Sequence, residues 1–356
     1  MKLRAATRSP WVRLGAVATL AGVVAVLLWK RGPDWGLVAD AFTVVRWEWV
    51  VAAIGLNLLS VVVRAFAWRT VINQAMPPPH PDARLVFSAF SVGLFANAVL
   101  PGRVGELARV AVLTRKLPSR EGAWATLVGS VAAHRVFDLV PVLLLVVWVL
   151  LTARIPHWAI TSLEALATIG VTLAAVLFFS ASRHPGQRID QGLGPVRRVI
   201  LLTRYGLGVM RAPVAAGIAL LFQCLGWLLQ LLAVWATMRA FDIRLELAAA
   251  GLVLVLMNIA TILPLWPGNV GLLQAAIALP LVHYGVSYPR GFAFGLGLQA
   301  IEASVGIGVG LIFLAREGLS FAMLRVMPEA TQAELPQDEP RAEEAARDRT
   351  PERVPG

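Results

Sequence analysis

Residues 100–105 read Leu-Pro-Gly-Arg-Val-Gly, and residues 266–271 read Trp-Pro-Gly-Asn-Val-Gly. Each stretch interrupts an apolar part of the chain, and the apolar run before the first one is only sixteen residues long, too short to cross a bilayer. Proline removes a backbone donor and glycine loosens the chain, so we expect the polypeptide to turn back at each break. The sequence therefore predicts two broken hairpins, over residues 85–117 and 247–284.

The composition is that of a membrane protein. Of 356 residues, 58% are hydrophobic and 15% are charged, and the mean hydropathy is +0.70. A soluble protein of this length would have about a quarter charged residues. Six runs are long enough for a membrane-spanning helix: 12–29, 48–72, 121–151, 159–180, 213–238 and 291–315. We therefore expect an all-α polytopic membrane protein with six full spans and two re-entrant broken hairpins.

Basic residues predict the orientation. Four of them lie within residues 1–13, at the start of the first span, which we interpret as an uncleaved anchor because no small-x-small cleavage site precedes Lys30. The loop 181–212 has six arginines and a single acid. Both segments should lie in the cytoplasm, which places both termini on the cytoplasmic side of an inner membrane. After a membrane domain over 1–326, residues 327–356 contain eight acids and four arginines, so we expect a disordered acidic cytoplasmic tail.

The two breaks belong to an internal repeat with an offset of 166 residues. The same offset carries the spans that flank the first break onto spans that flank the second. Repeat one then covers about 48–151 and repeat two about 213–316, and the charge argument orients them oppositely. Inverted repeats with interrupted helices indicate a transporter-like site near the bilayer midplane. The alternative is a chance recurrence of Pro-Gly-x-Val-Gly in a glycine-rich chain.

The residues after each Pro-Gly should bind anions. They open a helix whose first N–H groups lack intrahelical partners, and that end attracts phosphate. Arg103 and Arg109 would add forked donors, although they could instead face the cytoplasm as topology determinants. Glu106, in the first turn, could stabilise the helix end or pair with a proton or cation.

Four ionisable residues lie inside predicted spans: His134, Arg135, Asp138 and Glu302. Each central charge costs roughly 2.5–3.5 kcal/mol on insertion scales, so these side chains should face the interior and find partners. Arg135 could pair with Glu302 across the repeats, or with Asp138 on its own helix.

Other polar and aromatic residues have simpler interpretations. Arg64 is expected to extend its side chain to the membrane surface, and Trp49 and Trp68 to lie in the interfacial belt. Asn97 and Asn258, which precede the two breaks, should cap or cross-link helices.

The first break is similar to the signature of one known family, and reads Asn97-x-x-Leu100-Pro101-Gly102-Arg103-Val104-Gly105-Glu106-Leu107-x-Arg109. This is the lysylphosphatidylglycerol synthase transmembrane-region family, flippase-like membrane domains related to the N-terminal part of the bacterial multiple peptide resistance factor. The segment Leu263-Pro264-x-x-Pro267-Gly268-Asn269-Val270-Gly271-x-x-Gln274 resembles its second broken segment, and Arg135-x-x-Asp138 its mid-span pair. The resemblance covers about residues 10–320 and implies lipid translocation.

The chain also departs from that family. Asn269, Leu273 and Gln274 stand where the family usually has Gly, Arg and Glu, and an arginine is often found near Gln299. The second hairpin therefore lacks the family's charges. Only an acidic, proline-containing tail follows Arg316, so we expect neither a soluble aminoacyl-transfer domain nor lipid aminoacylation from tRNA.

Other function classes are disfavoured. No P-loop, GxGxxG, GxSxG or HExxH motif occurs, and the single cysteine forms no cluster with histidines, so we expect no ATP site, metal or cofactor. The net charge of +11 fits anionic lipid head groups and not nucleic acid. The leading hypothesis is a flippase that moves an anionic phospholipid or polyprenyl-phosphate-type lipid between leaflets. The alternatives are a lipid-modifying enzyme using His134 and Asp138, and a non-catalytic partner of envelope-lipid enzymes.

The candidate residues fall into two sets. The lipid-binding set is Asn97, Pro101, Gly102, Arg103, Gly105, Glu106, Arg109, Asn258, Pro267, Gly268, Asn269, Gly271 and Gln274. The gating or coupling set is His134, Arg135, Asp138 and Glu302.

Overall fold

The structure is a computed structural model. It describes residues 32–100, 104–117, 123–155, 212–261 and 269–316, with shorter stretches and single residues between 15 and 30 and between 160 and 172. The described residues form helices and no strands.

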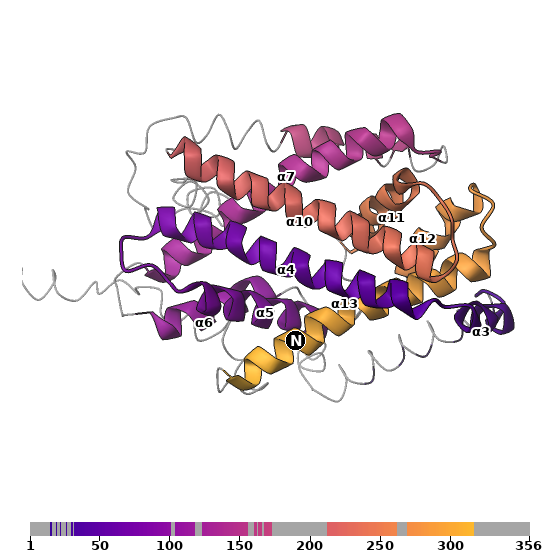
Figure 1. Cartoon of the computed structure of the whole chain (residues 1–356), viewed down its shortest axis with the longest axis horizontal. Coiled ribbons are helices and arrows are strands. Elements are labelled where there is room, and N and C mark those ends of the chain that lie inside the picture. The colour runs from indigo at the N-terminus through magenta and orange to yellow at the C-terminus, as the bar shows by residue number, and fades with distance from the viewer. Residues whose placement is uncertain are drawn as a thin grey trace, which may run out of the picture.

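The helices are arranged as two similar series (Figure 1). The short helix α3 (Trp35–Thr43) precedes both and is capped by Asp34, whose side chain accepts hydrogen bonds from the N–H groups of Gly36 and Leu37. The first series is α4 (Trp47–Ala75), α5 (Ala83–Val99), α6 (Gly105–Lys116) and α7 (Ala123–Thr152). The second is α10 (Pro213–Ala240), α11 (Leu247–Ala260), α12 (Leu272–Val282) and α13 (Tyr288–Arg316).

Four described helices are long and apolar enough to cross a membrane: α4, α7 from Thr126 onward, α10 and α13. A helix of 29 residues, such as α4, rises about 43 Å and can cross a hydrocarbon core of roughly 30 Å with tilt. The predicted span 159–180 is described only in part, as a short apolar helix over Leu163–Thr172. The predicted span 12–29, the loop 181–212 and the tail 327–356 lie almost wholly outside the described residues.

The two breaks separate helices that are too short to span. α5 has 17 residues and α6 has 12, whereas α11 has 14 and α12 has 11. α5 packs against α6, and α11 packs against α12. Both pairs lie where the sequence predicts broken hairpins.

The helix bounds and helix contacts recur between the two series. Shifted by 166 residues, α4 falls on 213–241 and α6 on 271–282, which are the bounds of α10 and α12 to within one residue. α5 packs on α13 of the other series, and α11 correspondingly packs on α7. One apolar core lies mainly within the first series and another mainly within the second.

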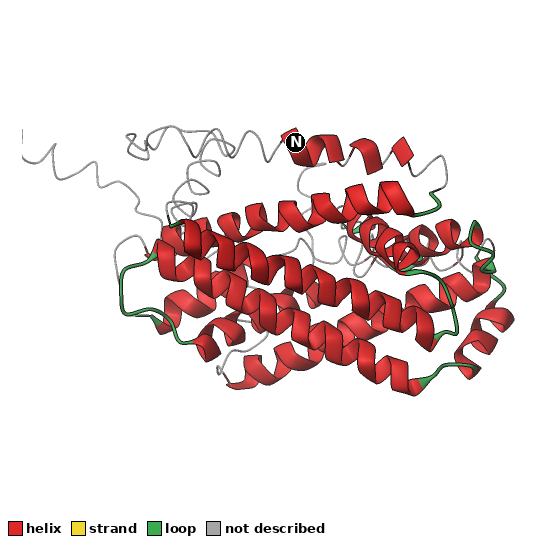
Figure 2. Cartoon of the chain, turned by 45° about the horizontal axis from the view of Figure 1, so that its top comes forward, coloured by secondary structure: helices red, strands yellow, loops and turns green. Residues whose placement is uncertain are grey.

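α4 and α10 join the two series (Figures 1 and 2). Two ring contacts show that they run antiparallel. Trp49 near the start of α4 packs edge-on against Trp235 near the end of α10, and Phe66 farther along α4 stacks on Phe222 near the start of α10. Near their crossing, Ser60 Oγ donates to the carbonyl of Gly226 at 2.8 Å. Ser60 and Gly226 are themselves separated by the repeat offset of 166 residues.

Candidate functional site

At the first break, a hydrogen bond joins the start of α6 to α5. Pro101, Gly102 and Arg103 lie outside the described residues. The Gly105 N–H donates to the side-chain oxygen of Asn97 on α5 at 2.9 Å, which satisfies one of the open donors of the helix end. A Cβ on Gly105 would collide with the Gly93 carbonyl and lie 2.6 Å from Asn97 Cγ. The two helices therefore approach closely only because glycine faces glycine.

A chain of charges connects α6 with α7. Glu106 pairs with Arg109 one turn later and with Arg135 on α7, and Arg135 also donates to Asp138 Oδ2 at 3.1 Å. The side chain of Arg135 is 53% exposed, whereas those of Glu106 and Asp138 are 26% and 11% exposed. Arg135 is therefore the accessible member of an otherwise enclosed cluster.

Asp138 extends this network to α10. Its Oδ1 accepts hydrogen bonds from Gln223 and, at 2.9 Å, from the indole N–H of Trp227. Since Oδ2 accepts from Arg135, both carboxylate oxygens are engaged. The predicted pair of Arg135 and Asp138 is confirmed.

The predicted pair of Arg135 and Glu302 is wrong. Glu302 on α13 accepts a hydrogen bond from Gln230 of α10 at 3.2 Å. Arg135 instead forms its second ion pair with Glu106, because α6 packs against α7.

Arg109 is buried within the first series. Its residue is 3% exposed, and its guanidinium lies over Trp68 at 4.6 Å and over Phe90 at 5.5 Å from the ring centroids. The alternative prediction, that Arg109 faces the cytoplasm as a topology determinant, is therefore wrong. Trp68 is fully buried beneath it, so its predicted interfacial place is also wrong.

The prediction that Arg64 extends to the membrane surface is wrong. Its guanidinium lies 4.9 Å from the ring centroid of Trp227, and its stem packs on Gly226, which has no side chain to occupy that space. Nε and Nη2 are enclosed and have no hydrogen-bond partner among the described residues. Arg64 therefore brings guanidinium donors that lack hydrogen-bond partners in the described part of the chain into the interior between α4 and α10.

His134 lies beside these charges. It is 2% exposed and meets Phe90 edge-on, with 6.1 Å between the ring centroids. Together with Asp138 it occupies the buried face of α7, while Arg135 points outward. The predicted interior position therefore holds for His134 and Asp138 but not for Arg135.

The second break is neutral. Asn269 adopts a φ of 45°, a left-handed conformation that Asn tolerates better than most residues, and its side chain donates to the Ala260 carbonyl at 3.0 Å. Gln274 accepts from the Gly271 N–H and donates to Gln299, both at 2.6 Å. Asn258 bonds within its own helix, to the Leu254 carbonyl. Pro267 and Gly268 lie outside the described residues.

Sequence reasoning missed three residues of the network: Gln223, Trp227 and Gln230. A signal was present, because Gln223 and Gln230 lie seven residues apart and share one face of an otherwise apolar helix. Polar side chains inside a span normally face a polar partner.

The network is balanced in charge within the described part of the chain. Three guanidinium groups, those of Arg64, Arg109 and Arg135, lie among three carboxylates, those of Glu106, Asp138 and Glu302. Among the described residues, no group of three or more His, Cys, Asp or Glu side chains could hold a metal ion. The guanidinium groups provide paired N–H donors in an apolar surrounding, an arrangement that suits a phosphate group.

Comparison with known proteins gives one match. A family model described as the lysylphosphatidylglycerol synthase TM region matches residues 13–310. No curated protein and no solved structure matches the chain.

Proposed function

Because the chain belongs to the lysylphosphatidylglycerol synthase transmembrane-region family, whose membrane domains are associated with lipid handling, we propose that it moves an anionic lipid between leaflets. The lipid would be a phospholipid or a lipid of the polyprenyl-phosphate type. The observation that carries this proposal is the charged network of Glu106, Arg135 and Asp138 beside the interrupted helix α6.

We also propose that the architecture is an inverted repeat of six spans and two re-entrant hairpins. The matching helix bounds and the antiparallel contact of α4 with α10 support two oppositely oriented halves. The bond between Ser60 and Gly226 supports a pseudo-twofold axis near that crossing, because it joins equivalent positions. Both termini would then lie in the cytoplasm, with the protein in the inner membrane.

In this proposal the head group first meets Arg135. Its guanidinium is accessible and is held by two carboxylates, which a lipid phosphate could replace in part. Arg103 and the helix start after Pro101 and Gly102 would bind the same phosphate. Arg109, sealed behind Trp68 and Phe90, would instead hold Glu106 in place.

The remaining charges would gate the passage. Asp138 connects α7 with α10, and Glu302 connects α13 with α10, so a change at either carboxylate would alter how the two halves pack. The neutral second hairpin, with Asn269, Gly271 and Gln274, would shape the other side of the passage without binding charge.

Transport accounts for the site better than lipid-modifying chemistry. Asp138 accepts hydrogen bonds on both oxygens and His134 is buried against Phe90, so neither is placed to exchange a proton with a substrate. With no ATP-binding motif in the sequence, movement would be passive or driven by an ion gradient.

A leaflet-accessibility assay tests the proposal. Full-length protein is reconstituted into vesicles containing a trace of fluorescent lipid, and dithionite bleaches the label in the outer leaflet. We expect a second bleaching phase for anionic lipids, about tenfold slower with Arg135→Gln and partly restored with Arg135→Lys, because a charge-assisted hydrogen bond contributes about 1.5–3 kcal/mol.

The matched control is Arg154→Gln, which changes an exposed arginine outside the network. Equal rates for wild type, Arg135→Gln and Arg154→Gln, at equal reconstituted amounts, would contradict the proposed role of Arg135. The absence of any second phase with every lipid tested would contradict translocation itself.

A further inference from the structure

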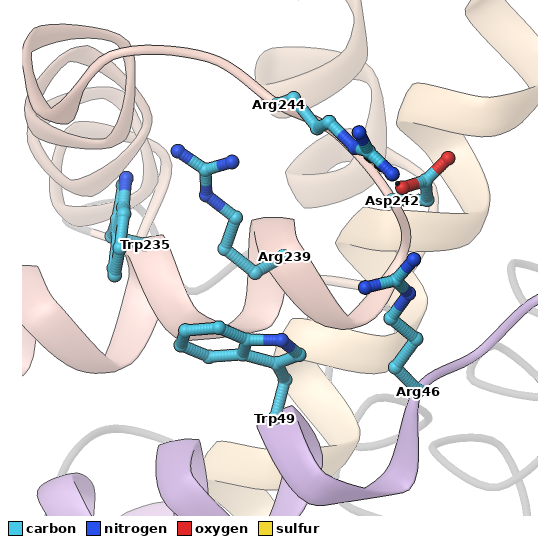
Figure 3. A pocket seen from close by; sticks show the side chains of 6 residues that line it. All are labelled: Arg46, Trp49, Trp235, Arg239, Asp242 and Arg244. Carbon is cyan, nitrogen blue, oxygen red and sulfur yellow. Dashed lines mark hydrogen bonds and ion pairs between the residues drawn. The ribbon is translucent and has the colours of Figure 1, made fainter.

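A second charged site lies where α4 begins and α10 ends, away from the network already described (Figure 3). A cavity of about 250 Å³ is lined there by Arg46, Trp49, Trp235, Arg239, Asp242 and Arg244. Arg239 follows Gln230 by nine residues, so the cavity lies about 13 Å farther along α10 than the bond to Glu302.

The backbone around the cavity is held in place by hydrogen bonds. The Arg46 N–H donates to the Ala240 carbonyl at 2.9 Å, which fixes the start of α4 to the end of α10. Asp242 has a φ of 53°, and Arg290 holds this turn by donating to the carbonyls of Phe241 and Asp242 at 3.0 and 3.1 Å. The walls of the cavity are therefore built independently of any ligand.

Positive charge is in excess in the cavity. Three guanidinium groups line it against one carboxylate, that of Asp242. Asp242 is already engaged by Arg244 at 2.9 Å and by Arg290 at 3.4 Å, and the Arg244 hydrogen bond holds the pKa of this carboxyl below its usual value. Neither Arg46 nor Arg239 forms an ion pair with a described residue.

The rest of the lining is aromatic. Trp49 and Trp235 meet edge-on with 5.7 Å between their ring centroids, and Arg239 lies 4.7 Å from the centroid of Trp235. Nε of Arg239 is enclosed and has no hydrogen-bond partner among the described residues. Tryptophan with arginine gives a surface that is apolar on one side and cationic on the other, as at a membrane–water interface.

Topology does not explain these arginines. The positive-inside rule places basic residues in the cytoplasm, but the proposed orientation puts the start of α4 and the end of α10 on the outer side. Arg239 could favourably offset the dipole at the end of α10, but that leaves Arg46 and Arg244 unexplained. A ligand of opposite charge explains all three.

We propose that this cavity binds a phosphate group, supplied by the head group of a lipid in the outer leaflet. The phosphate would lie between Arg46 and Arg239, and the glycerol and upper acyl chains would lie against Trp49 and Trp235. Arg244 stays with Asp242 and closes one side of the cavity.

Isothermal titration calorimetry with the purified full chain in detergent tests this site. Dihexanoyl phosphatidylglycerol, inorganic phosphate and uncharged dihexanoylglycerol are titrated separately. We expect the phospholipid to bind and the uncharged lipid not to, with Arg46→Gln and Arg239→Gln each weakening binding about tenfold. Arg154→Gln, an exposed arginine outside the cavity, should change the affinity less than about twofold.

Asp242→Asn should act in the opposite direction. It removes the competing carboxylate while asparagine tolerates the positive φ, so phosphate binding should tighten about threefold. A purely structural role for these residues would not produce a gain. If Arg239→Gln fails to fold, Arg239→Lys and Asp242→Asn carry the test.

Each outcome decides the proposal. Binding of inorganic phosphate alone, lost in both arginine variants, would retain the phosphate site and assign it a soluble ligand. Unchanged binding of both phosphate ligands in both variants would overturn it. Binding is measured at equilibrium, so this site can fail while translocation stands, and translocation can fail while this site stands.

Discussion

The hydrogen bond from Trp227 to Asp138 should be one of the stronger contacts between α7 and α10. The indole N–H lies 2.9 Å from Oδ1 of a buried carboxylate. Hydrogen bonds to charged groups contribute about 1.5–3 kcal/mol, whereas side-chain hydrogen bonds between membrane helices average only about 0.6 kcal/mol. The charge on Asp138 therefore decides which magnitude applies.

A double-mutant cycle with Trp227→Phe and Asp138→Leu measures this contact. Phenylalanine keeps an aromatic ring under Arg64 but removes the donor together with part of the indole, while leucine removes the acceptor and is larger than aspartate. The loss of partners for Arg135 and Gln223 occurs in both arms and cancels. We expect a coupling free energy of about 1.5–3 kcal/mol.

Equilibrium unfolding in mixed micelles with increasing dodecyl sulfate, followed by far-ultraviolet circular dichroism, gives the four free energies. The control cycle pairs Asp138→Leu with Trp49→Phe. Trp49 packs on Trp235, eight residues or about 12 Å along α10 from Trp227, so its coupling should be close to zero. A coupling between Trp227 and Asp138 of about 0.6 kcal/mol or less would refute a charged acceptor at this position.

Three further substitutions test the two breaks, each by its thermal midpoint in detergent. Gly105→Ala should lower the free energy of unfolding by at least about 1–3 kcal/mol, because the added Cβ would displace Gly93 and Asn97. The control Gly55→Ala should be neutral or stabilising, because no atom lies near that position. Equal midpoints for the two variants would contradict the close packing of α5 on α6. Arg109→Lys should cost about 1 kcal/mol, since a point charge replaces a planar group stacked on two rings, and an unchanged midpoint would show that stacking contributes nothing. Gln274→Glu should lower the free energy of unfolding by about 1–3 kcal/mol, because it buries a carboxylate opposite Gln299. Adding Gln299→Arg should restore the thermal midpoint by pairing that carboxylate. An unrestored midpoint would show that residues 274 and 299 do not face each other.

The sequence was sufficient to predict most of the described helices, although α3 was not among the predicted segments. Apolar run lengths distinguish α4 and α13 from the short helices around the breaks, because the bilayer sets a minimum length that is visible in a single chain. The repeat offset of 166 residues could be found from Pro-Gly-x-Val-Gly, and the helix bounds follow the same offset.

Side-chain partners were predicted less well because they depend on which helices meet. Asp138 lies three residues after Arg135, so their pairing follows from helix geometry alone. Glu302 was assigned to Arg135 from the repeat, but the start of α6 brings Glu106 there first. Arg64 was expected to reach the membrane surface, and Arg109 to bind a head group or to face the cytoplasm. Instead each guanidinium lies over a tryptophan, Trp227 and Trp68 respectively, and no local sequence pattern predicts these contacts.

The balance of three guanidinium groups and three carboxylates in the described interior has an electrical consequence. Because this network has no net charge, its movement during the proposed translocation would add little net charge, so an anionic lipid would cross the membrane field with its own charge alone. In a cell whose interior is negative, this field favours outward movement by about 2.3 kcal/mol per elementary charge for every 100 mV. The membrane potential alone would then give the proposed movement a direction, which fits a sequence without an ATP-binding motif.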